Sequence, residues 1–165
     1  YGVKQALKHD FDYLIEIGSD DLLKNEVLNA YKWDSPVLGL MGFALINTEN
    51  GSCKSIKTSI PKYGAGRAIK REICERFDLW EGGRSRGMDN SSCRILALNR
   101  VMQKGVKSEE PLAISLKSAE NIWSYKGMPG TKYPLEKALN GLSEEEINAI
   151  QCLVAKNKSE SLIGV

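Results

Sequence analysis

The stretch FDYLIEIGSDD, residues 11–21, decides the fold class. Residues 11–17 are nearly all apolar and rich in aromatic and β-branched side chains, as is typical of a strand covered on both faces in an α/β sheet. Residues 18–21 (GSDD) end this strand, and residues 22–31 are predicted to form a short helix. Adjacent acids at the carboxyl end of a buried strand predict a ligand site, because α/β sheets bind their ligands there.

More strands are predicted further along the chain. Residues 36–46 form an apolar run, and residues 52–58 would return beside it. The Asn50-Gly51 pair between them favours a hairpin turn, because both positions accept positive φ. Residues 112–116 are predicted to add another strand.

Helices are predicted to flank this sheet. The loop at residues 63–67 would open a helix whose apolar stripe is Ile69, Ile73 and Phe77. Asp89 or Asn90 would cap a later helix ended by Gly105. The inner face of that helix would carry Ile95, Leu98 and Met102.

The C-terminal part of the sequence is predicted to be helical. Pro134 is placed at a helix start and Gly141 at a helix end. Ser143 and Glu146 then form the pattern of a capping box, which predicts a second helix with Ile150 inward.

Composition narrows the class of protein. The chain has 165 residues, 42% hydrophobic and 27% charged, enough for one packed domain. A net charge of +2 does not demand nucleic acid as a partner, and no apolar run approaches the roughly 18 residues of a membrane-spanning helix. Four widely spaced cysteines and one histidine leave few components for a zinc site or a Ser-His-Asp triad. These features favour a cytoplasmic protein without a membrane span.

Asp20 and Asp21 are the first candidates for chemistry. Adjacent carboxylates suit Mg²⁺ or Mn²⁺, which prefer oxygen ligands and share them with a substrate diphosphate. The alternative is that Ser19, Asp20 or Asp21 merely caps the following helix. The spacing alone leaves both interpretations open.

Residues 12–21, residues 63–71 (YGAGRAIKR), and Trp80 with residues 86–89 (RGMD) follow one another in a recognisable order. The first segment resembles the DYIL-x-LDSDD segment of GT-A fold glycosyltransferases of the large family two type. The second is similar to that family's glycine-containing loop and helix on the acceptor side. The third resembles the later loop whose acid serves as catalytic base. Together they cover about residues 2–116.

The resemblance implies a role for each matching residue. Asp20, which matches the family's second metal-binding acid, would hold Mn²⁺ or Mg²⁺ on the donor diphosphate, with Asp21 added by its position beside Asp20. Asp89 would be the catalytic base that takes the proton of the acceptor hydroxyl. Further contacts to the donor diphosphate would come from Ser19, Arg67, Arg84 and Arg86. The acceptor would be bound by Gly64, Ala65, Gly66, Trp80 and Met88.

The chain departs from the family at two of these positions. Gly18 stands where the metal motif usually begins with Asp, and Met88 stands where Glu usually precedes the catalytic acid. Ordinary structural roles stay open for several others: an N-cap for Asp89, a solvated first helical turn for Arg67, and packing for Trp80 and Trp123.

The sequence therefore predicts an α/β domain over residues 1–133, a partial GT-A (Rossmann-like) mixed sheet with flanking helices, and a C-terminal helical extension over residues 134–165. The family's first strands, which bind the nucleobase and ribose, would precede Tyr1. The predicted activity is metal-dependent transfer of a sugar from a nucleotide-sugar donor to an acceptor hydroxyl. The alternative is a catalytically inactive glycosyltransferase-like module that binds carbohydrate or a protein partner. A missing N-terminal segment or a second copy of the chain would cover the sheet edge left open.

Overall fold

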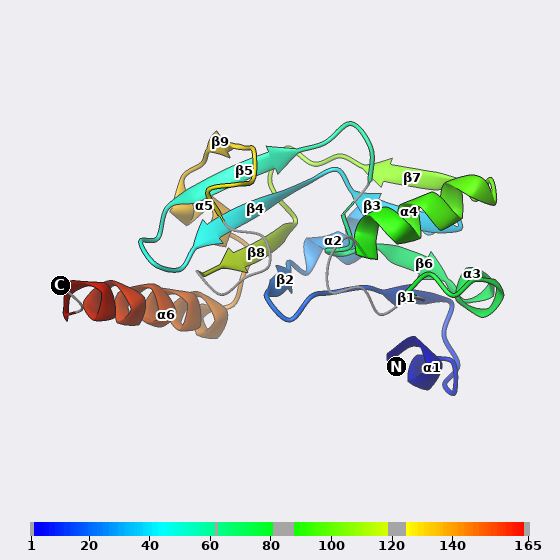
Figure 1. Ribbon diagram of the computed structural model, residues 1–165, viewed down its shortest axis with the longest axis horizontal. Helices are drawn as coiled ribbons and strands as arrows, with labels where there is room; N and C mark the ends of the chain where they lie inside the picture. Colours follow the sequence, from blue (N-terminus) through cyan, green and yellow to red (C-terminus); the bar gives the residue numbers. More distant parts are fainter. Residues whose placement is uncertain (1, 62, 81–87, 119–124, 164–165) are drawn as a thin grey trace.

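Two mixed β-sheets carry the fold, with helices packed around them (Figure 1). The computed structural model describes residues 2–61, 63–80, 88–118 and 125–163. In order, the first sheet consists of β1 (Tyr13–Ile15), β6 (Ala68–Lys70), β3 (Val37–Leu40) and β7 (Gln103–Val106). The second consists of β2 (Asp21–Leu23), β8 (Ala113–Lys117), β4 (Gly42–Asn47), β5 (Cys53–Lys57) and β9 (Thr131–Lys132). The predicted α/β class is confirmed.

The apolar run at residues 36–46 contributes to both sheets. Strand β3 lies parallel to β7 in the first sheet, and β4 lies parallel to β8 in the second. Met41 separates them: its N–H donates to the carbonyl of Val106 at 3.0 Å, and its carbonyl accepts from the N–H of Thr58 at 2.8 Å. The prediction of one continuous strand is therefore wrong at Met41, where the chain changes sheets.

The segment after the acid turn is a strand where a helix was predicted. Strand β2 pairs antiparallel with β8, with Leu22 opposite Ile114. Leu22 and Leu23 pack against different core clusters, one on each face of the strand. This alternation explains why residues 21–23 extend, and the helix, α2 (Glu26–Ala30), begins only afterwards.

The helices beside the first sheet also differ from the prediction. Residues Ala68–Lys70 form β6 in the interior of the sheet, so α3 (Arg71–Arg76) begins later than expected. The next helix, α4 (Met88–Leu98), ends well before Gly105, which lies in β7. Leu98 and Met102 were predicted on its inner face, but they are 72% and 60% exposed, and the buried residues among its described side chains are Ser92 and Leu96.

Local turn and capping signals are confirmed. Strands β4 and β5 form the predicted hairpin, with Gly51 at φ 74°. Ser143 Oγ accepts a 3.2 Å hydrogen bond from the N–H of Glu146, and the Glu146 carboxylate accepts one of 2.8 Å from the N–H of Ser143. This capping box opens α6 (Glu144–Ile163), the long helix beside the second sheet in Figure 1.

The helices at the two ends of the chain lie on different sheets. Helix α5 (Leu135–Leu139) and α6 cover the core of the second sheet through Leu139, Ile150 and Val154. Helix α1 (Gly2–Ala6) lies near the first sheet (Figure 1), where Val3 packs against the cluster under α3 and α4. Among the described residues, none of the helices combines the length and apolar character needed to cross a bilayer.

Candidate functional site

The acid turn, residues 18–21, links β1 of the first sheet to β2 of the second. The N–H of Gly18 donates to Asp21 Oδ2 at 3.1 Å, and the N–H of Asp21 donates to the carbonyl of Gly18 at 3.2 Å. The carbonyl of Asp20 accepts a 2.7 Å hydrogen bond from the N–H of Leu116 in β8. The turn is thereby fixed against the carboxyl end of β8, which runs parallel to β4. Such an edge is where α/β sheets place ligands.

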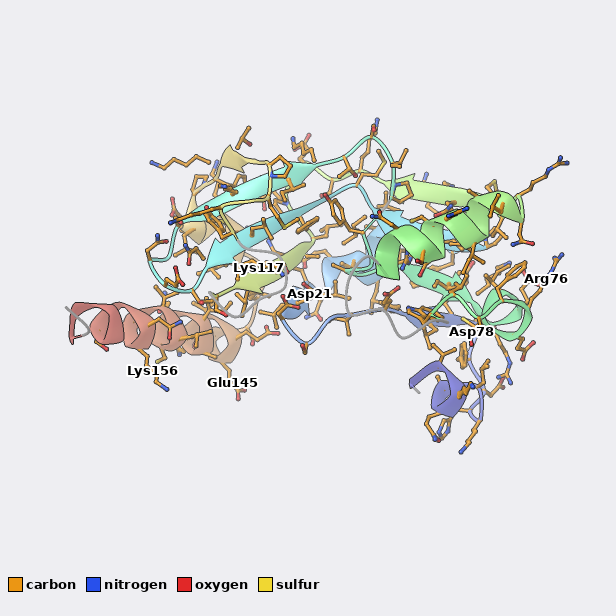
Figure 2. All side chains as sticks on the ribbon, viewed as in Figure 1. Asp21, Arg76, Asp78, Lys117, Glu145 and Lys156 are labelled. Carbon is orange, nitrogen blue, oxygen red and sulfur yellow. The ribbon has the colours of Figure 1, made fainter. Side chains whose placement is uncertain are left out.

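Lys117, the last residue of β8, forms an ion pair with Asp20 across this turn. The Lys117 ammonium donates a short hydrogen bond to Asp20 Oδ2. The lysine side chain is 11% exposed and that of Asp20 is 32% exposed. Figure 2 shows Lys117 and Asp21 close together where the two sheets meet.

The Asp21 carboxyl is partly buried and has several partners. Burial raises its pKa, and the charge of Asp20 adds to the shift. Hydrogen bonds from Ser115 and from the backbone of Gly18, with the charge of Lys117, oppose it. The two acids of the turn therefore differ, because Asp20 is paired with a cation while Asp21 is held mainly by neutral donors.

Arg67 lies in the interior, contrary to the predicted position at a helix N-terminus. It immediately precedes β6 and is fully buried. Its Nη2 and Nε donate to Glu16 Oε2 at 2.7 and 3.1 Å, and its Nη1 contacts Cys93 Sγ at 3.5 Å. These internal partners give the guanidinium a structural role, and the predicted contact with a diphosphate stays a prediction.

The glycine-containing loop is shaped by packing. Gly66 has φ +78°, and a Cβ there would lie 3.0 Å from Leu23 and 3.1 Å from Leu40. Its carbonyl accepts a hydrogen bond from the buried Tyr31 hydroxyl, and its N–H donates to the carbonyl of Glu16 at 2.9 Å. Of the predicted acceptor residues in this loop, Gly64 and Gly66 are buried and Ala65 is half-buried.

Trp80 adds to the same cluster. Its indole N–H donates to Glu16 Oε1 at 3.3 Å, and the half-buried ring packs against the core under α3 and α4. This is the usual behaviour of a tryptophan with one apolar face and one polar partner. The packing role that the sequence left open for Trp80 is therefore present.

Helix α4 begins at Met88, so Asp89 lies within its first turn and not ahead of it, as an N-cap would. Cys93 follows one helical turn later in the same helix. Because Cys93, in the middle of α4, contacts Arg67, and Arg67 donates to Glu16, α4 lies near the end of β1. The predicted residues Arg84 and Arg86, and also Trp123, fall outside the described residues, as do the side chains of Met88 and Asp89.

The acid turn as it stands does not fit a divalent cation. Within the described ranges, no group of three or more His, Cys, Asp or Glu side chains is placed to hold a metal. Gly18 supplies no carboxylate, Asp20 is paired with Lys117, and Asp21 accepts hydrogen bonds. Ser19, the remaining predicted donor-binding residue, is exposed at the tip of the turn.

Sequence reasoning missed three residues of this region: Glu16, Cys93 and Lys117. Glu16 interrupts an apolar strand, which signals a buried partner of opposite charge. Lys117 comes directly after the predicted strand at residues 112–116, but its pairing with Asp20 joins positions 97 residues apart. No spacing rule connects such positions before the sheet order is known.

Comparison with known proteins found no match to a protein-family model, to a curated protein or to a solved structure. The likeness to glycosyltransferases therefore depends on the three sequence segments described above.

Proposed function

We propose that this chain takes part in sugar transfer from a nucleotide-sugar donor to an acceptor hydroxyl. The observation that carries the proposal is the connection through Arg67. Its guanidinium joins Glu16, two residues before the acid turn, to Cys93, one helical turn after Asp89. An acid suited to proton abstraction and a charged turn at a sheet edge therefore belong to neighbouring elements, as a transfer reaction requires.

In this proposal Asp89 takes the proton of the acceptor hydroxyl as its oxygen attacks the anomeric carbon and the nucleoside diphosphate departs. Arg84 and Arg86, which stand a few residues earlier in the chain, supply positive charge to the departing diphosphate. The dependence on Mn²⁺ or Mg²⁺ stays a prediction, because the ion would have to displace Lys117 from Asp20. No step of the transfer is assigned to a metal ion.

The test compares Asp89→Asn with wild type in the full-length protein. Transfer or hydrolysis of UDP- and GDP-sugars should fall about 100-fold or more, the scale of a lost general base, while donor binding is retained. Asp78→Asn, which changes an exposed acid outside the turn, serves as the matched control and should leave turnover unchanged. Equal turnover of Asp89→Asn and wild type would overturn the role of Asp89.

The ion pair between Asp20 and Lys117 favours a second candidate, an inactive glycosyltransferase-like module that binds carbohydrate or a protein partner. A turn already neutralised by lysine has less need of a bound cation or donor. Titration of the folded protein with UDP and GDP separates the candidates. Saturable binding supports the transferase, and its absence with and without Mn²⁺ supports the module.

A further inference from the structure

The charge balance of the acid turn is set within the chain. Lys117 brings an ammonium group to Asp20 Oδ2, one of the two oxygens that this carboxylate could offer to a metal. The lysine extends from the last residue of β8, whose N–H···O bonds to β2 and β4 hold its backbone in place. Its carbonyl also accepts a 2.8 Å hydrogen bond from the N–H of Thr48. The cation is therefore delivered from a fixed strand and not from a mobile loop.

Displacing this ammonium is costly. The Lys117 side chain is only 11% exposed, so breaking the pair leaves a mostly buried positive charge without its carboxylate. A divalent ion bound to Asp20 would also lie beside that charge and be repelled by it. Mg²⁺ in particular requires carboxylate oxygens at about 2.0–2.1 Å, and the lysine nitrogen already occupies the space beside Asp20 Oδ2.

We infer that Lys117 takes the place of a divalent cation at the acid turn, so that the chain binds its donor without a metal. For the identity of the donor, this inference rests on the proposed function. Lys117 is then a positioning residue, because its ammonium group neutralises Asp20 and holds the acid turn against β8. The loss of the usual first Asp at Gly18 is consistent with this, since a lysine needs fewer oxygen partners than an octahedral ion.

Metal binding by itself provides the first test. Mn²⁺ is titrated against the full-length protein, and free ion is followed by electron paramagnetic resonance. Wild type should show no saturable site at millimolar Mn²⁺, whereas Lys117→Met should gain one, with affinity raised about tenfold or more. The double variant Lys117→Met/Asp20→Asn should lose it again. Lys57→Met, which removes an exposed lysine of the same sheet, should behave as wild type.

A stoichiometric Mn²⁺ site in wild type would overturn the inference, whether or not Lys117→Met strengthens it. The wild-type titration decides the matter even if Lys117→Met fails to fold. Folding of each variant is checked by circular dichroism.

Nucleotide binding provides the second test and separates this inference from the proposed function. UDP and GDP are titrated against wild type in EDTA and in Mn²⁺, and the two dissociation constants should agree within about twofold. Binding that requires Mn²⁺ would overturn the inference and leave the proposed function intact. Absence of binding in both conditions would overturn the proposed function, and the Mn²⁺ titration alone would then decide the role of Lys117.

Discussion

Two ion pairs flank the end of β1, and they differ in almost every respect except charge. Arg67 is fully buried, donates twice to Glu16 and also contacts Cys93. Lys117 is the last residue of β8 in the second sheet. Its ammonium donates to Asp20, and its side chain is 11% exposed. Their carboxylates are only four positions apart in the sequence.

The difference between the two pairs shows how burial determines whether an ion pair only stabilises the fold or also keeps a carboxylate in contact with solvent. A planar guanidinium satisfied on several sides in the interior fixes three elements in one arrangement. An ammonium at the rim fixes one carboxylate, which stays 32% exposed and in contact with solvent. The first pair belongs to the scaffold, whereas the second lies at the kind of sheet edge where α/β proteins bind ligands. Each prediction below tests this distinction.

Arg67→Met should have the largest effect. It leaves Glu16 without its counter-charge and removes the link to α4, so the free energy of unfolding should fall by about 3–5 kcal/mol. Urea unfolding followed by circular dichroism measures the loss. Arg76→Met, at an exposed position labelled in Figure 2, is the control and should change stability by about 0.5 kcal/mol or less. Similar losses in both variants would mean that Arg67 is no scaffold residue.

Two glycine substitutions compare the backbone of the loop before β6 with that of the acid turn. Gly66→Ala should cost about 1–3 kcal/mol, because φ is +78° and its Cβ would press on Leu23 and Leu40. Gly18→Ala should cost less, since its Cβ would meet only side-chain carboxylates that can move, that of Asp21 at 2.6 Å and that of Asp20 at 3.1 Å. Thermal unfolding of the two variants checks the order. A larger loss for Gly18→Ala would show that the acid turn is the more rigid region.

Lys117→Met should change the free energy of unfolding by about 1 kcal/mol or less, far below the effect of Arg67→Met. Asp20, which is 32% exposed, recovers hydration when its partner is removed, and methionine leaves no buried charge behind. Urea unfolding at low and high salt checks this, and the difference between wild type and variant should shrink at high salt. A loss as large as that of Arg67→Met would place Lys117 with the scaffold.

The smallest effect is expected for Asp21→Asn, and it depends on pH. Burial raises the folded-state pKa of Asp21, so the folded chain binds the proton more tightly, and stability falls as pH rises from the unfolded value of 3.8 through the folded value. The variant lacks this loss and should unfold at a slightly higher urea concentration than wild type at neutral pH, but not at about pH 3.

Asp34→Asn provides a control of opposite sign. The hydrogen bond from Lys104 lowers the pKa of Asp34, which contributes stability above the unfolded value of 3.8 that is lost as pH falls through the folded value. This variant should therefore unfold slightly earlier than wild type at neutral pH, and the difference should vanish in acid. The same sign for both variants would contradict the assigned cause of the Asp21 shift.

The sequence predicted those elements whose signals are local. The first strand, the hairpin at Gly51 and the capping box at Ser143 depend on neighbouring residues, and all three are present. Neighbouring residues could not show that residues 21–23 form β2, where a helix was predicted to begin. Leu22 and Leu23 suit either state, and pairing with β8, far along the chain, determines the outcome.

In the site too, the sequence predicted what depends on neighbouring residues and missed what depends on the pairing of distant strands. The acid turn was located because glycine and two acids after an apolar strand form a local pattern. The interior position of Arg67 was missed, because residues 63–67 suggest a helix start until β6 is known to lie between β1 and β3. Lys117 was missed because only the order of strands in the second sheet brings it to Asp20.

The change of sheet between β3 and β4 at Met41 couples the unfolding of the two sheets. With only one residue between a strand of each sheet, neither sheet can unfold without pulling on an interior strand of the other. The amide protons of Met41, which is hydrogen-bonded to Val106, and of Ala44 should then exchange with solvent at one common rate, set by global unfolding. Cutting the polypeptide at this joint would leave two fragments, each deprived of an interior strand.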